Sequence, residues 1–383
     1  MIAATTLPRS PRLVFGAGCL ARLGEEAAPL AATGPVLLVA DPGIPALAHQ
    51  AAEALAGAGL EVATFSDVRS DPLASQVDAA AEAARAAGAR LVVGLGGGSA
   101  LDTAKLAAAV AGAAAPAEHY GLCANPLPPP LPKILIPTTA GTGSEATRTA
   151  IITTAAGAKV WTWGEELLAD VALLDPELTV GLPRGLTVAT GVDALVHAIE
   201  AATNRRHHPL SDAPALQAIR LVRRWLPRAI EAPADLDARG SLLIASWLAG
   251  QAIDGAGTGI AHSLGHALGA LAHVHHGRAV GLSLRVALAG NAEASPAAHA
   301  EVARAFGLEG EDDAALAAAL APAFDGFLRQ VGLDLRLPED QLPLDRLVGE
   351  TRKPENLPMI DANCRAYDEG DLRRLGQSLL AAA

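Results

Sequence analysis

The first half of the chain alternates short apolar runs with alanine-rich stretches of helical spacing. The apolar runs lie at residues 36–40, 61–65, 90–94 and 133–136, and the intervening helices are predicted from residue 44, over 74–87 and over 100–111. Short apolar runs that are separated by turn residues and helices are typical of parallel strands with crossover connections. The pattern therefore predicts an α/β domain with a parallel sheet, of the kind that binds nucleotides.

The second half of the chain lacks this alternation. After a strand-like segment at 171–176 and a turn at 181–185, the sequence continues in long helical segments. A chain of 383 residues also exceeds what one hydrophobic core usually holds. We therefore predict an α/β domain over residues 1–183 and an all-helical domain over residues 184–383.

Composition excludes several classes of protein. Charged residues make up 18% of the chain and the apolar set 51%, which is too little charge for a disordered protein. The net charge is −12 and no basic block is longer than a pair, so we expect no nucleic-acid partner. The N-terminal segment lacks the apolar core of a signal peptide, and no run is long enough to cross a membrane. We expect a cytoplasmic protein without a membrane segment.

The cysteines indicate neither a disulfide framework nor a thiolate metal site. Cys19, Cys123 and Cys364 are far apart and lack the CxxC spacing, so we expect reduced thiols.

A glycine-rich segment between a predicted strand and a predicted helix is the first candidate site. Gly97, Gly98 and Ser99 follow the strand and open the helix. Glycines let the backbone approach an anion closely, and the first N–H groups of a helix have no partner within it. A phosphate group fits such a segment, and a tight turn between strand and helix is the alternative.

Hydroxyl side chains follow the next strand along the chain. They are Thr138, Thr139, Thr142 and Ser144. Ligands of open α/β sheets bind beyond the carboxyl ends of the strands, so both loops suit one nucleotide; an ordinary polar loop is the alternative. Asp41 directly follows the strand at 36–40, where a carboxylate accepts ribose hydroxyl groups and repels a 2′-phosphate. A helix cap is the alternative for Asp41.

Aspartate and histidine side chains recur at a spacing of four residues in the second half. Asp193 and His197 form one such pair, His262 and His266 form another, and residues four apart project from the same face of a helix. Five of the eleven histidines lie between 262 and 276. Histidine and carboxylate ligands without cysteine suit Fe²⁺ or Zn²⁺, so we predict a metal site here. Outside this set, His207, His208 and His299 lie in polar or loop-like segments and are expected to be structural.

Five motifs, in this order and spacing, resemble the iron-containing (group III) alcohol dehydrogenase family. They are GGGSALDTAK, PTTAGTGSEAT, DPELTVGLP, TGVDALVHAIEA and AHSLGHALGALAHVHHG. The resemblance implies a Rossmann-like NAD-binding α/β domain, an all-α metal-binding domain, and an active site between them that acts on a small alcohol or aldehyde. It also implies a homodimer or a larger homo-oligomer. Maleylacetate reductase and glycerol dehydrogenase share parts of this pattern, as does dehydroquinate synthase, a metal- and NAD-dependent lyase, and all three remain alternatives.

The resemblance also implies roles for single residues. Metal ligands by position are Asp193, His197, His262 and His276, for Fe²⁺ with Zn²⁺ as the alternative. His266 matches a catalytic histidine that assists proton transfer. Cofactor-binding positions are Asp41, Gly97, Gly98, Ser99, Thr138, Thr139, Thr142, Ser144 and Lys159, while Asp102 and Lys105 match structural supports of the first turn of the helix. Asp41, and Asp71 where the family usually has Asn, favour NAD over NADP.

Two departures from the family pattern affect the substrate pocket. Arg148 replaces a residue that is commonly small, which raises an anionic substrate as an alternative to a structural arginine. Cys364 stands at the proline position of an Asn-Pro-Arg element, so the back wall of the pocket is not predicted from the family pattern.

Overall fold

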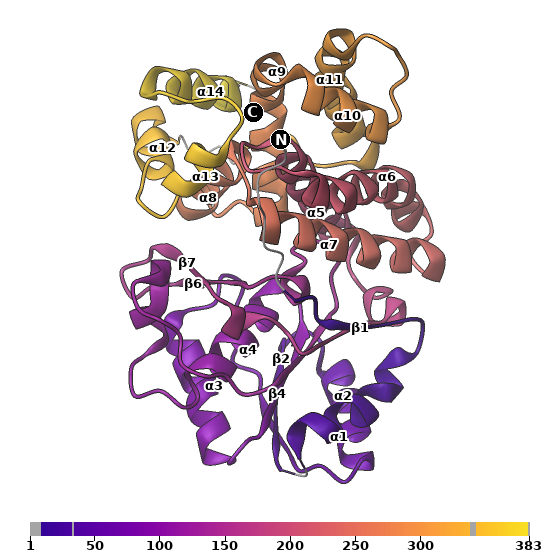
Figure 1. The fold of residues 1–383 in the computed structure, drawn as a ribbon, viewed down its shortest axis with the longest axis vertical. Helices are drawn as coiled ribbons and strands as arrows, with labels where there is room; N and C mark the ends of the chain where they lie inside the picture. Colours follow the sequence, from indigo (N-terminus) through magenta and orange to yellow (C-terminus); the bar gives the residue numbers. More distant parts are fainter. Residues whose placement is uncertain (1–8, 33, 338–341, 382–383) are drawn as a thin grey trace. The chain divides into compact units, whose positions relative to one another are not determined.

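The structure, a computed structural model, describes residues 9–32, 34–337 and 342–381. These residues divide by their contacts into two compact units, one ending at Leu182 and the other beginning at Pro183. The first unit carries a parallel sheet with helices, and the second is helical (Figure 1). The predicted fold class is confirmed. The outer ends of the two predicted domains, residues 1–8 and 382–383, lie outside the described residues.

A six-stranded parallel sheet of the order β1-β8-β5-β4-β2-β3 forms the frame of the first unit. Val36 pairs with Val62 on one side and with Leu91 on the other, so the sheet continues on both sides of its strand. The strands are β1 (Arg12–Phe15), β2 (Val36–Ala40), β3 (Val62–Phe65), β4 (Leu91–Gly96), β5 (Lys133–Pro137) and β8 (Val171–Leu174). Every residue of β2, β4, β5 and β8 is buried, as expected for parallel strands with both faces covered.

Helices cover both faces of this sheet (Figure 1). On one face lie α1 (Leu23–Ala31) and α2 (Pro45–Gly57), and on the other lie α3 (Ala74–Ala86) and α4 (Gly98–Val110). Val36 and Leu38 pack into the core beneath α1 and α2, whereas Leu37 and Val39 pack into the core beneath α3 and α4. Side chains of a strand alternate between faces, so one short apolar run supplies both cores.

Several elements of this unit differ from the sequence-based expectation. The pattern did not predict β1, α1, or the antiparallel pair β6 (Thr149–Thr153) and β7 (Lys159–Trp163). The pair mixes Thr and Lys with its apolar residues and buries only alternate positions, so it lacks the continuous apolar run of a central strand. Short 3₁₀ helices complete the unit at Cys19–Arg22, Ala117–Cys123, Ser144–Ala146, Glu165–Leu167 and Pro176–Thr179.

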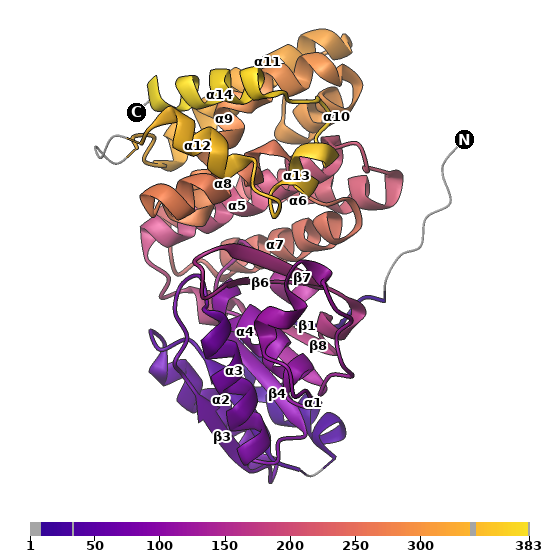
Figure 2. The same cartoon turned by 90° about the vertical axis from the view of Figure 1, so that its left-hand side faces the viewer.

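The second unit is arranged around a buried central helix, α5. Every residue of this helix from Thr187 to Thr203 is buried, and it packs against α6, α7 and α9. Further along the chain, α12 and α13 pack against α8 (Figure 2). The helices are α5 (Arg184–Thr203), α6 (Pro209–Glu231), α7 (Leu236–Ala256), α8 (Ile260–Ala272), α9 (His276–Ala294), α10 (Pro296–Phe306), α11 (Asp313–Val331), α12 (Leu344–Thr351), α13 (Leu357–Ala362) and α14 (Glu369–Ala381). No helix in the described ranges is long and apolar enough to cross a membrane.

Candidate functional site

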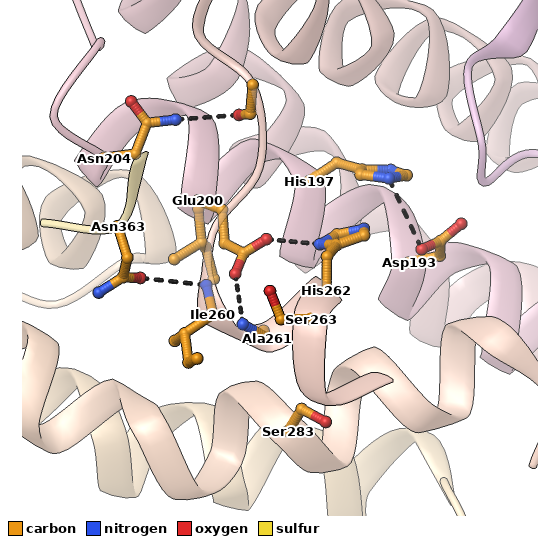
Figure 3. Close-up of polar contacts among 12 residues, drawn as sticks. Asp193, His197, Glu200, Asn204, Ile260, Ala261, His262, Ser263, Ser283 and Asn363 are labelled. Atoms are coloured by element: carbon orange, nitrogen blue, oxygen red, sulfur yellow. Dashed lines mark hydrogen bonds and ion pairs between the residues drawn. The ribbon is translucent and has the colours of Figure 1, made fainter. Parts of the chain in front are cut away.

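Three helices of the second unit bring together four side chains of the types that bind metal ions. Asp193 and His197 lie one turn apart on α5, His262 lies in the first turn of α8, and His276 begins α9. One ligand atom from each of these residues lies within 4.8 Å of the others. The Nε2 atoms of His197 and His276 are 3.9 and 3.5 Å from Asp193 Oδ1. The structure therefore brings together the four residues that the sequence predicted as metal ligands, and three of them appear in Figure 3.

This cluster is buried and has unmet bonding capacity. Asp193, His197 and His262 are 2%, 5% and 3% exposed, and Asp193 Oδ1, His197 Nδ1 and His262 Nε2 have no hydrogen-bond partner. A buried polar atom without a partner costs about 1–3 kcal/mol. Three such atoms in one cluster, two on imidazole rings and one on a carboxylate, fit a divalent cation of borderline softness.

The protonation of the cluster also suits a metal ion. Burial, with the neighbouring His197 and His266, lowers the pKa of His262 well below its usual 6.5, so its ring is neutral and can bind a cation. The rings of His197 and His262 stack with centroids 4.6 Å apart, an arrangement that two charged rings would oppose. Burial raises the pKa of Asp193, because its negative charge is removed from water, and the nearby His197 offsets this only in part.

A glycine explains how α9 approaches the central helix so closely. A Cβ atom on Gly277 would lie 2.1 Å from the backbone oxygen of Ala189 and 3.1 Å from Asp193 Cβ. Only a residue without a side chain therefore permits this contact, which places His276 beside Asp193.

His266 lies one turn after His262 on α8, with its ring centroid 5.6 Å from that of His276. Its Nδ1 atom is 3.2 Å from Asn356 Oδ1, and the amide nitrogen of Asn356 donates to the backbone oxygen of Glu350 at 3.0 Å. Since Oδ1 of Asn356 can only accept, His266 Nδ1 carries the proton and Nε2 is the accepting nitrogen of the neutral ring. Asn356 was not identified from the sequence, because it is separated from His266 by a long stretch of chain and has no motif.

The three histidines expected to be structural lie away from the metal cluster. His208 accepts the N–H groups of Leu210 and Ser211 and so caps α6, and the Nδ1 atom of the buried His299 lies 2.8 Å from the backbone oxygen of Ser295. His207 lies 3.2 Å from a carboxylate oxygen of Asp212. The three cysteines are free and lie outside the metal cluster.

The first unit places Asp41 and the glycine-rich segment at the point where the strand order reverses. The chain continues from β2 to β3 in one direction and from β4 to β5 in the other, with α2 and α4 on opposite faces. Ligands of open α/β sheets bind beyond the carboxyl ends of the strands at such a point. Asp41 Oδ1 accepts the N–H of Gly43 at 2.8 Å, and α2 begins only at Pro45 with Ile44 before it, so Asp41 does not cap that helix.

The glycine-rich segment and the hydroxyl-rich loop are in direct contact. A Cβ atom on Gly98 would lie 2.7 Å from Thr142 Cγ2, and the N–H of Thr138 donates to the backbone oxygen of Gly96 at 2.9 Å. Gly96 has a φ of +149°, and a Cβ there would meet Asp41 Cβ at 2.9 Å. The helix α4 starts at Gly98 without a side-chain cap, which leaves its first N–H groups for an anion.

The structure shows what Ser144 does within its loop. Its hydroxyl donates to Asp102 at 2.6 Å, and the fully buried Lys105 donates to the Ser144 and Thr149 backbone oxygens at 2.7 and 2.5 Å. Asp102 also accepts the N–H of Ile151 at 3.0 Å. Asp102 and Lys105 therefore join α4 to the hydroxyl-rich loop. From the sequence we expected them to support the first turn of the helix instead. Thr139 and Thr142 are half-buried, and Thr138 is buried.

Two basic residues of this unit are paired with carboxylates. Lys159 on β7 lies 2.6 Å from Asp71, so the structure brings together the two residues that the sequence placed near the cofactor. Arg148 lies 2.6 Å from Glu165 and 4.4 Å from the ring centroid of Trp163, and it is 8% exposed. These contacts favour the structural interpretation of Arg148 over a role in binding an anionic substrate.

Family models match both halves of the chain. The model for iron-containing alcohol dehydrogenase matches residues 10–176, and the model for the C-terminal part of the Fe-containing alcohol dehydrogenase family matches residues 187–347.

Individual relatives agree with this match. The NAD-dependent methanol dehydrogenase of Bacillus methanolicus is 34% identical over 328 residues, which cover 84% of this chain and 86% of that protein. The sulfoacetaldehyde reductase of Bilophila wadsworthia is 36% identical over 297 residues, 76% of each chain. A crystal structure of 1,3-propanediol oxidoreductase matches with a TM-score of 0.90 and 29% identity, over 99% of this chain and 100% of that chain. Since the similarity extends over the sheet unit and the helical unit alike, the chain belongs to the iron-containing alcohol dehydrogenase family and is an NAD-dependent, metal-dependent oxidoreductase of alcohols and carbonyl compounds.

Proposed function

We propose that Asp193, His197, His262 and His276 together hold one divalent cation, Fe²⁺ with Zn²⁺ as the alternative. The observation that carries this proposal is the convergence of four ligand atoms within 4.8 Å, in a buried cluster that contains three polar atoms without a hydrogen-bond partner. When bound, such a cation is a Lewis acid that polarises the oxygen of an alcohol or carbonyl group. The four side chains contribute one negative charge, which is less than the charge of a divalent cation. The occupied site would therefore keep a net positive charge beside the substrate oxygen.

Metal analysis and an activity screen test this proposal together. Protein purified without chelator is expected to hold one cation per chain and to form NADH with at least one short alcohol, diol or hydroxy acid. Chelation is expected to remove this activity, and Fe²⁺ or Zn²⁺ to restore it. Full activity in metal-free protein would contradict the proposed metal site, and bound metal without NADH formation from any alcohol would contradict the dehydrogenase reaction.

In the proposed mechanism His266 moves the proton of the substrate hydroxyl group. Its Nδ1 atom is held as a donor by Asn356, so its Nε2 atom accepts a proton during oxidation and returns it during reduction. His266 is partly exposed, whereas His262 is buried, so a proton taken up at His266 can pass to solvent.

Replacing His266 with glutamine is expected to lower kcat roughly 10²- to 10⁴-fold, the range that positioned acid–base groups contribute. Metal content should be unchanged, because His266 lies outside the four-ligand cluster. Steady-state kinetics with parallel metal analysis check this expectation. The control is His207→Gln, which changes a histidine beside Asp212. Wild-type kcat in His266→Gln would rule out the proton-transfer role.

For the cofactor we propose that Asp41 binds the ribose hydroxyl groups and that Gly97, Gly98 and Ser99 bind the diphosphate. Thr138, Thr139 and Thr142 would add donors from the second loop, with Ser144 holding that loop in place, and Lys159 would lie near the second ribose. The reversal of strand order at Asp41 supports this arrangement, as does the uncapped start of α4. The acidic Asp41 and Asp71 support NAD over NADP.

Replacing Gly98 with alanine is expected to raise the Kd for NAD⁺ roughly tenfold or more. The new methyl group would lie 2.7 Å from Thr142 Cγ2 and would push the two loops apart, and overpacking of this kind costs about 1–3 kcal/mol. Titration of NAD⁺ against protein fluorescence measures the change. Gly57→Ala is the control, because a Cβ at Gly57, the last residue of α2, meets nothing within 4 Å. Equal Kd values for both variants would contradict the packed-loop explanation.

We propose that the substrate is a small uncharged alcohol or the corresponding aldehyde. The pairing of Arg148 with Glu165 supports an uncharged substrate, because this arginine is already engaged. Two of the relatives are named for methanol and 1,3-propanediol, which are uncharged, whereas a third is named for sulfoacetaldehyde, which is anionic, so the pairing of Arg148 is the observation that supports this choice. We further propose a homodimer or larger assembly in the cytoplasm. Leu13 and Phe15, 42% and 47% exposed on the edge strand β1, support self-association, which light scattering would measure.

A further inference from the structure

We propose that Glu200 is a positioning residue of the metal site, which fixes both the ring of His262 and the start of the helix that carries it. This inference rests on the metal site proposed above. Glu200 lies on α5 with Asp193 and His197, at spacings of seven and three residues, so all three side chains project from one face of that helix. The Glu200 side chain is 2% exposed.

The two carboxylate oxygens of Glu200 have different partners in the segment that begins α8. Oε2 lies 2.5 Å from Nδ1 of His262, and Oε1 accepts the backbone N–H of Ala261 at 2.7 Å (Figure 3). One carboxylate thus contacts a side chain and the backbone next to it. The ring of His262 and the backbone of its helix are held relative to α5 by the same group.

The contact with Nδ1 determines which nitrogen of His262 faces the cluster. When Nε2 binds a metal, Nδ1 keeps its proton and donates it to Glu200, so the carboxylate orients the ring and increases the basicity of the ligand nitrogen. Nε2 is buried and has no hydrogen-bond partner, whereas Nδ1 has one. This asymmetry is what a metal-binding imidazole requires.

The start of α8 depends on side chains from elsewhere in the unit. Its N-cap residue is Gly259, which cannot cap the helix with a side chain, and the N–H of Ile260 donates to Asn363 Oδ1 at 3.2 Å. A Cβ on Gly259 would lie 2.8 Å from Asn363 Oδ1 and 3.0 Å from Glu200 Oε1. The absence of a side chain at Gly259 therefore leaves room for the Asn363 and Glu200 side chains, which accept the first N–H groups of α8. The carboxylate of Glu200 also lies at the positive end of the helix dipole.

Glu200→Gln tests the inference because the amide keeps the size of the side chain but has one accepting oxygen. That oxygen can accept from His262 or from Ala261, and the amide nitrogen would face the other N–H group. We expect the Kd for Co²⁺, measured by competition with a chromogenic chelator, to rise roughly 10- to 100-fold, the usual effect of losing the partner of a ligating histidine. The visible absorption of bound Co²⁺ should also change, because the ligand ring is no longer fixed.

Asn363→Ala is the matched control. It removes the cap on Ile260 but leaves the carboxylate on His262, so we expect a lower Tm with an unchanged Co²⁺ affinity. An unchanged Co²⁺ affinity in Glu200→Gln would overturn the positioning role while the metal site stands. Equal losses of affinity in both variants would also overturn it, because loosening of the helix start would then explain the effect.

Failure of the metal site itself gives a different result. Wild-type protein that binds no Co²⁺ would overturn the proposed site and this inference together. If Glu200→Gln does not yield a folded protein by circular dichroism, Glu200→Asp replaces it. Aspartate keeps the charge but shortens the reach to His262, so it is expected to weaken Co²⁺ binding as well, and wild-type affinity in that variant would overturn the inference.

Discussion

Asp193→Ala is expected to abolish tight metal binding and to lower turnover by a factor of roughly 10³ or more, because the cation is expected to supply several kcal/mol of the catalytic effect. The variant removes the only carboxylate of the four-ligand set and leaves the three imidazoles. His262→Ala is expected to behave in the same way. NAD⁺ binding should be retained, because the proposed cofactor residues belong to the other unit.

The stability of the metal-free protein separates this effect from misfolding. Burial raises the pKa of Asp193, which means that the folded apo-protein is destabilised by ionising this carboxyl group. Asp193→Ala should therefore not lower the Tm of apo-protein greatly, but the rise in Tm that added Zn²⁺ causes in the wild type should disappear. A variant that still shows this metal-dependent rise would contradict the assignment of Asp193 as a ligand.

Lys105→Met is expected to destabilise the first unit by about 3–5 kcal/mol, the usual result of removing one partner of a buried charged pair. Lys105 has no exposed surface, and its ammonium group donates to oxygens of Ser144, Thr147 and Thr149. Methionine would fill the space but leave these acceptors, and the largely buried carboxylate of Asp102 at 3.9 Å, without the cation. Urea unfolding followed by circular dichroism measures the loss.

Two further variants test whether the loss of stability in Lys105→Met comes from the buried charge network. Lys353→Met removes a half-exposed lysine that pairs with Glu350, and surface pairs contribute about 0–1 kcal/mol, so it should change stability little. The double variant Lys105→Met, Asp102→Asn should recover part of the loss, because it no longer leaves a largely buried carboxylate without its cation. A wild-type urea midpoint for Lys105→Met would contradict the importance of this buried network.

Local patterns in the sequence were sufficient for the fold class and for most candidate ligands. The alternation of apolar runs and helical stretches predicted the parallel sheet because strand and helix periods are local properties of the backbone. The spacing of Asp193 and His197 predicted a shared face for the same reason. The hairpin of β6 and β7 was missed, because strands that bury only alternate side chains leave a weaker pattern than a central strand.

The sequence by itself thus determined which residue types could bind a metal and a nucleotide, and on which elements they lie. Only the tertiary structure decided their partners. Glu200 could have been grouped with Asp193 and His197 by spacing, but its contact with His262 joins two helices that are far apart in the chain. Asn356 and His266 meet in the same way, and the Ser144 hydroxyl is engaged by Asp102. Such contacts depend on the packing of distant elements and on side-chain directions within a few tenths of an ångström, which no local periodicity encodes.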